Sequence, residues 1–157
     1  MNLGMWVRLA MKRHLALVVD YDAVISGDAD GSISEALDSI VDCDVHVVVL
    51  VPAGARVDHL HELDVSWFYL DDEADVTWGM LRDHVDADAI IALADPDHYP
   101  HLFAASETRE VSIAVRGQAE ARGWLSGALS IREFVRWLIA MRTGWMVRAP
   151  RFDVGWA

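Results

Sequence analysis

Aspartates stand at the ends of stretches that are typical of buried β-strands. Asp20 follows the apolar run Leu15–Val19, and Asp95 and Asp97 follow the apolar run Ala89–Ala94. In an open parallel sheet, ligands bind beyond the carboxyl ends of the strands, near the point where the strand order reverses. If these two strands are neighbours, the three carboxylates converge at that point.

Asp75 can supply a fourth carboxylate, because it stands one turn into the helix expected after the strand Val65–Leu70. Carboxylates held a few ångströms apart repel one another, so such a group normally needs Mg²⁺ or Mn²⁺. Two such cations can activate water and stabilise the leaving oxygen when a phosphodiester is hydrolysed. The candidates for catalysis and for metal binding are therefore Asp20, Asp75, Asp95 and Asp97.

The elements that would position these side chains alternate between strand and helix. Continuous apolar runs predict five buried parallel strands, at Leu15–Val19, Val45–Val51, Val65–Leu70, Ala89–Ala94 and Val111–Val115. Helices are expected over 33–41, after Asp71-Asp72, from Tyr99 and over the apolar stripe Ile131–Ile139, which Gly144 would end. This alternation predicts a three-layer, Rossmann-like α/β fold with a central parallel five-stranded sheet.

With 157 residues, the chain fits one domain. We expect residues 1–117 to form the α/β body, with 1–13 as an N-terminal extension that is a short helix or frays. Residues 118–157 would add a helical extension and a Trp/Arg-rich tail. The apolar runs are shorter than the roughly 18 residues that cross a membrane, and the charges of the N-terminal segment follow its apolar residues, unlike those of a secretory signal. With a single cysteine, Cys43, these features predict a cytoplasmic protein with no membrane partner.

Charge is distributed unevenly along the chain. The net charge is −12, yet residues 108–157 hold eight arginines against four acids. Such asymmetry can mark a surface that faces nucleic acid. The candidate RNA contacts are Arg116, Arg122, Arg132 and Arg136. Tryptophans in the same third of the chain also suit packing, or an interface with a protein partner or a second copy of the chain.

Three segments in register resemble the NYN domains, a branch of the PIN-like nucleases. They are "LALVVDYDAV" (Leu15–Val24), "EADVTWGML" (Glu73–Leu81) and the stretch Ala87–Gly117 with its Asp95-Pro96-Asp97 turn. The resemblance implies a ribonuclease that depends on Mg²⁺ or Mn²⁺. Its implied catalytic residues and metal ligands are Asp20, Asp75, Asp95 and Asp97. Asp22 and His98 are candidates for supporting these acids because they stand close to them in the sequence, and not because of the resemblance.

The chain departs from the pattern of this family at several positions. Ala23 stands where the family usually has asparagine, His98 replaces a phenylalanine, Ala94 replaces a glycine, and the lysine often found before the helix aspartate is absent. The first alternative is therefore an NYN-like domain that has lost catalysis and serves as a binding or regulatory domain.

Two other enzyme classes share part of the pattern. Asp20-Tyr21-Asp22-Ala23-Val24 resembles the opening motif of haloacid dehalogenase-like phosphatases, in which the first aspartate is the nucleophile. That hypothesis predicts that Asp20 and Asp22 face a pocket with an arginine nearby. Asp95-Pro96-Asp97 also resembles the metal motif of family-2 glycosyltransferases, which predicts a nucleotide cleft.

Overall fold

The computed structural model describes residues 8–26, 31–55, 60, 63–104, 110–115, 120–122 and 129–144. The candidate RNA contact Arg116 and the Trp/Arg-rich tail after residue 144 lie outside these residues. No helix in the described ranges is long and apolar enough to cross a membrane.

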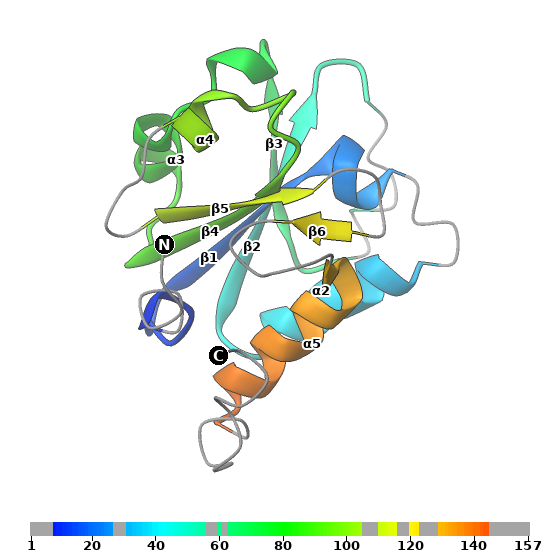
Figure 1. Ribbon diagram of the computed structural model, residues 1–157, viewed down its shortest axis with the longest axis vertical. Helices are drawn as coiled ribbons and strands as arrows, with labels where there is room; N and C mark the ends of the chain where they lie inside the picture. Colours follow the sequence, from blue (N-terminus) through cyan, green and yellow to red (C-terminus); the bar gives the residue numbers. More distant parts are fainter. Residues whose placement is uncertain are drawn as a thin grey trace.

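A mostly parallel sheet forms the centre of the molecule (Figure 1). Its strands lie in the order β3-β2-β1-β4-β5-β6-β7. The first five are parallel, and two short strands that the sequence reading did not predict continue the sheet in antiparallel pairing. The strands are β1 (Leu15–Asp20), β2 (Val45–Pro52), β3 (Ser66–Leu70), β4 (Ala89–Ala94), β5 (Glu110–Val115), β6 (Glu120–Arg122) and β7 (Leu129–Ser130). The predicted α/β fold with a parallel five-stranded sheet is confirmed.

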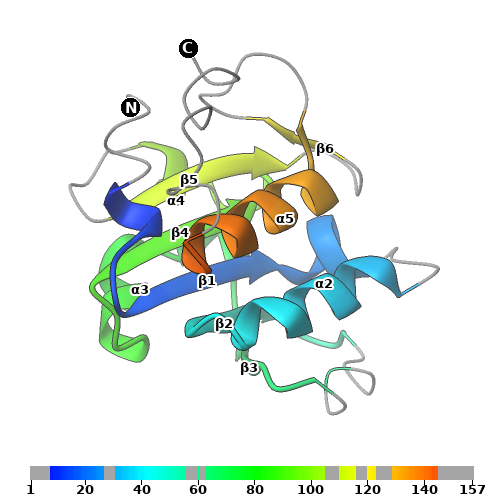
Figure 2. The same ribbon diagram turned by 90° about the horizontal axis from the view of Figure 1, so that it is seen from below.

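Both faces of the central strands are buried, which explains their continuous apolar sequences. In β1, Leu15, Leu17 and Val19 join one core, whereas Ala16 and Val18 join the other. The first core lies under α2 (Ser32–Val41) and α5 (Ile131–Arg142), and the second lies under α3 (Trp78–His84) and α4 (His101–Ala104). Figures 1 and 2 show these helix pairs on opposite sides of the sheet, as the prediction of three layers requires.

The segment after β3 differs from the expected helix. The Asp72 carboxylate accepts a hydrogen bond from the Ala74 N–H (2.9 Å), and a short 3₁₀ turn, η3 (Glu73–Asp75), follows. The α-helix begins only at Trp78, because the Thr77 hydroxyl accepts from the Met80 N–H and caps it. The expectation that the α-helix follows Asp71-Asp72 directly was wrong, because it starts six residues after Asp72.

Arg142, near the end of α5, joins three parts of the chain. Its guanidinium donates five hydrogen bonds, all to backbone carbonyls: Nε to Cys43, Nη1 to Ala10 and Lys12, and Nη2 to Arg13 and Asp44. Five is the full donor capacity of the guanidinium. Leu9 and Ala10 are buried in the first core, so this part of the expected N-terminal extension packs as part of the domain.

Each of the two long helices has a glycine next to one of its ends, in a backbone conformation that suits glycine. Gly31, the residue before α2, has φ 72°, and Gly144, shortly after α5, has φ 81°. Both values lie in the left-handed region that glycine adopts at little cost. The predicted end of α5 at Gly144 is confirmed.

Candidate functional site

Asp20 lies where the predicted site was placed, at the carboxyl end of β1. This strand pairs with β2 on one side and β4 on the other, so the strand order reverses here. The Asp20 residue is only 1% exposed. A five-residue π-helix, η1 (Tyr21–Ile25), follows immediately and turns the backbone over the carboxylate.

Four donors from the protein surround the Asp20 carboxylate. Oδ1 accepts from the backbone N–H groups of Asp22 (3.1 Å) and Ala23 (3.3 Å). Oδ2 accepts from the backbone N–H of Asp95 (3.1 Å) and lies 3.2 Å from Nδ1 of His98. An ionised carboxylate only accepts hydrogen bonds and offers about four lone-pair positions. When Asp20 is ionised, Nδ1 of His98 is therefore the donor in this contact, and the four donors together use the acceptor capacity of the carboxylate.

Burial raises the pKa of the Asp20 carboxyl above its ordinary value, because a charge is poorly solvated there. The hydrogen bonds from the Asp95 N–H, His98 and the Ala23 N–H act in the opposite direction and do not fully offset this effect. The ionised form of Asp20 therefore depends on these donors, and a positive charge on His98 stabilises it further.

Asp95 and Asp97 form a tight turn beside Asp20. Oδ1 of Asp95 accepts from the Asp97 N–H (2.9 Å), and the Asp95 carbonyl accepts from the N–H groups of His98 and Tyr99 (both 3.0 Å). Asp97 itself is exposed. Asp95 thus shapes the turn that brings His98 to Asp20, as an Asx-turn residue does.

Asp75 lies apart from this group. It is exposed and follows β3, which is separated from β1 by β2. Neighbouring strands lie about 4.8 Å apart, so the ends of β1 and β3 are separated by roughly 10 Å. Among the described residues, which include all four predicted ligands, no three or more His, Cys, Asp or Glu side chains form a group that could hold a metal ion.

The structure therefore unites part of the predicted site. It brings together the side chains of Asp20 and His98 and the backbone of Asp22 and Asp95, and it leaves Asp75 at a distance. The side chain that pairs with Asp20 within the described ranges is that of a histidine, rather than the arginine that the phosphatase hypothesis predicted.

The predicted RNA contacts lie in different elements. Arg122 ends β6, and Arg132 and Arg136 lie four positions apart on α5, where Arg136 is exposed. RNA binding through these arginines stays a prediction.

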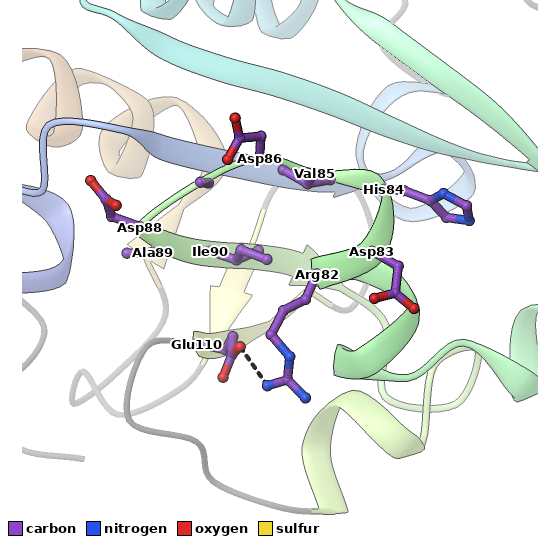
Figure 3. Close-up of a pocket in the computed structure, with 10 residues that line it drawn as sticks. Arg82, Asp83, His84, Val85, Asp86, Asp88, Ala89, Ile90 and Glu110 are labelled. Carbon is purple, nitrogen blue, oxygen red and sulfur yellow. Dashed lines mark hydrogen bonds and ion pairs between the residues drawn. The ribbon is translucent and has the colours of Figure 1, made fainter.

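An ion pair with one buried member, which sequence reasoning missed, lies at the opposite end of the sheet. Arg82 of α3 donates through Nη1 to Oε1 of Glu110 at the start of β5 (2.8 Å). The Glu110 side chain is 4% exposed and that of Arg82 is 51% exposed. Figure 3 shows the two side chains pointing toward each other at a hollow of about 320 Å³, whereas Asp86 and Asp88 point away from the pair. The signal in the sequence was weak: one acid at the start of an apolar strand.

A second hollow, of about 470 Å³, lies between the end of β3 and α3. Tyr69, Leu70 and Met80 line it together with the exposed carboxylates of Asp71, Asp72 and Asp75. It is a site of mixed apolar and acidic character.

Comparisons with known proteins add no relative. No protein-family model matches the chain, and no curated protein or solved structure matches it either.

Proposed function

We propose that this chain is a non-catalytic binding domain with a PIN-like architecture, in which Asp20 stabilises the fold instead of holding a metal ion. One observation carries this proposal: the buried Asp20 carboxylate accepts hydrogen bonds from three backbone N–H groups and from His98. A metal ligand needs a lone pair that is free to face the cation, and these four donors occupy the positions available on Asp20.

The other predicted ligands support the same function. Asp95 uses one carboxylate oxygen within its own turn, and Asp75 lies beyond β2. For a cation to bind Asp20, at least one of the hydrogen bonds to this charged group would have to break, each of which contributes about 1.5–3 kcal/mol. The predicted set therefore does not fit a metal centre in this arrangement.

A cleavage assay tests the proposal directly. The purified protein is incubated with single-stranded and structured RNA in Mn²⁺ and, separately, in Mg²⁺, with EDTA as the control. We expect no cleavage that depends on the metal. Cleavage that EDTA stops and that Asp95→Asn abolishes would contradict the proposal.

A metal-dependent endoribonuclease is the second candidate function. It is favoured by the position of the buried Asp20 carboxylate, which lies beside the turn after β4 at the point where the strand order reverses. A cation near the buried carboxylate would stabilise its ionised form, which burial disfavours. This function requires the Asp20 carboxylate to exchange at least one internal hydrogen bond for a metal ion, so it predicts that Mn²⁺ changes the stability of the folded protein.

A further inference from the structure

Glu110 brings a buried carboxylate to the hollow at the start of β5 (Figure 3). Its side chain is 4% exposed, whereas that of its partner Arg82 is 51% exposed. The one hydrogen bond that Glu110 accepts from a described residue runs from Nη1 of Arg82 to Oε1. Oε2 therefore has no donor from the described part of the chain. A buried acceptor in this position calls for a partner, and a molecule held in the hollow can supply one.

The hollow has the size and the walls that a small organic molecule needs. Its volume is about 320 Å³, which lies at the lower end of the roughly 300–1,000 Å³ that ligand pockets occupy. Part of the lining is apolar and comes from the segment between α3 and β4, namely Val85, Ala87, Ala89 and Ile90. An aliphatic chain can pack on such a wall while its charged end lies elsewhere.

The charge of the lining favours a cation. The described lining holds four acids and two basic residues: Arg82, Asp83, His84, Asp86, Asp88 and Glu110. A phosphate or carboxylate group would be repelled by the excess of acids, whereas an ammonium group can donate a charge-assisted hydrogen bond to Oε2 of Glu110. Asp86 and Asp88 are exposed and point away from the Arg82–Glu110 pair. They therefore lie on the outer side of the hollow, where they attract a second positive charge.

We infer that this hollow binds a small aliphatic polyamine. One ammonium group donates to Oε2 of Glu110, the methylene chain packs on the apolar wall at Ile90, and a further ammonium group lies toward Asp86 and Asp88. Arg82 stays paired with Oε1, so the buried carboxylate is shared between a cation of the protein and one of the ligand. The site lies at the opposite end of the sheet from Asp20. It goes beyond the proposed function and does not depend on whether Asp20 binds a metal ion.

The test measures the binding of putrescine, a short diamine, to the full chain. Isothermal titration calorimetry is done at neutral pH in about 0.15 M salt, where long-range attraction is largely screened. Glu110→Gln removes the charge at nearly constant size and should weaken binding at least about tenfold, which corresponds to about 1.4 kcal/mol. The matched control is Glu35→Gln, the same change at an exposed glutamate of α2 outside the hollow. It should leave the affinity unchanged.

Replacing Arg82 should have the opposite effect. In Arg82→Met the Glu110 carboxylate lacks its internal cation, so putrescine should bind at least about threefold more tightly. Arg136→Met makes the same charge change on α5 outside the hollow and should leave the affinity as it is. Tighter binding by one variant and weaker binding by the other cannot both result from a loss of folding.

Two other cations test the shape of the ligand. Butylamine has the same chain with one ammonium group and should bind at least about threefold more weakly than putrescine. Mg²⁺ carries the same charge without the chain and should compete poorly. Equal binding by the wild type and Glu110→Gln, equal effects of Arg82→Met and Arg136→Met, or displacement of putrescine by an equal concentration of Mg²⁺ would overturn the proposal in favour of diffuse attraction to an acidic protein. Absence of binding at millimolar putrescine would overturn it in favour of an empty hollow.

Discussion

Nδ1 of His98 lies 3.2 Å from Oδ2 of Asp20, although the two residues are 78 positions apart in the chain. The contact joins the turn after β4 to the end of β1 and supplies the side-chain donor to a carboxylate that is otherwise held by the backbone.

Replacing His98 tests the importance of this donor. His98→Phe removes the Nδ1 donor, so we expect the free energy of unfolding to fall by about 1–2 kcal/mol, the cost of removing one of the two donors to Oδ2 of a buried carboxylate. His98→Asn can place an amide N–H near the same position and should lose less. The measurement is urea unfolding at neutral pH, and equal stability of the wild type and His98→Phe would show that the contact contributes nothing.

The pH dependence of stability reports the buried Asp20. Its pKa is raised in the folded protein, so the folded state holds a proton on this group more strongly than the unfolded state. Its contribution to stability is fully present below the ordinary value of 3.8 and is lost as the pH rises through the folded pKa. Relative to Asp20→Asn, the free energy of unfolding of the wild type should therefore fall as the pH rises from below 3.8 through the folded pKa of Asp20. Above that pKa, the difference between the two proteins should stay constant.

The difference in unfolding free energy between the wild type and Asp20→Asn isolates the contribution of Asp20, because the other carboxylates titrate in both proteins. Repeating the comparison in the His98→Asn background removes the histidine's own titration. A difference between wild type and Asp20→Asn that grows in favour of the wild type over the same range would contradict the expected direction.

Two substitutions at Asp95 separate a turn residue from a metal ligand. Asparagine keeps the oxygen that accepts from the Asp97 N–H, so Asp95→Asn should change the melting temperature little. Asp95→Ala should lower stability by about 1 kcal/mol, the usual contribution of such a hydrogen bond. Under the nuclease hypothesis, Mn²⁺ would instead raise the wild-type melting temperature beyond the effect of K⁺ at equal ionic strength, and Asp95→Asn would abolish this increase.

Arg142 should contribute more to stability than any exposed arginine of the same helix. Arg142→Met leaves the five carbonyls without their shared donor, so we expect a loss of about 3 kcal/mol. The matched control is Arg136→Met, because Arg136 is exposed on α5 and such substitutions usually stay within about 0.5 kcal/mol. Equal losses for the two variants in thermal unfolding would show that the carbonyl contacts of Arg142 are not stabilising.

The Arg82–Glu110 pair can be tested by a double-mutant cycle. Arg82→Met leaves the buried Glu110 carboxylate without its cation and should cost about 1–2 kcal/mol, less than for a fully buried pair because Arg82 is half exposed. Arg82→Met/Glu110→Gln should restore part of the lost stability. Additive effects of the single variants would show that the two side chains do not couple.

The sequence predicted the sheet well because burial on both faces leaves a local signal. β1 and β4 are continuous apolar runs, and the aspartates that follow them mark their carboxyl ends. The strands β6 and β7 were missed because three and two residues are too short to show a period. The start of α3 was misplaced because Asp72 and Thr77 both suit a cap, and only the folded chain distinguishes them.

The candidate site was predicted in position but not in chemistry. That Asp20 and Asp95 meet follows from the pairing of β1 with β4, which parallel topology makes accessible to sequence reasoning. The use of the Asp20 carboxylate by backbone donors depends on the π-helix after β1, whose five residues carry no distinctive pattern. The separation of Asp75 depends on β3 occupying the outer position of the sheet, which residue types alone do not specify.

The long-range contacts of Arg142 also constrain the order of events during synthesis. The guanidinium binds carbonyls of residues made about 100 and 130 positions earlier, and the same helix carries Phe134, Leu138 and Met141 into the first core. Until α5 has left the ribosome, the part of the first core that it covers stays exposed. The last described helix to be made is thus the one that closes the domain, so a nascent chain that stalls before residue 142 presents an open apolar sheet to chaperones and proteases.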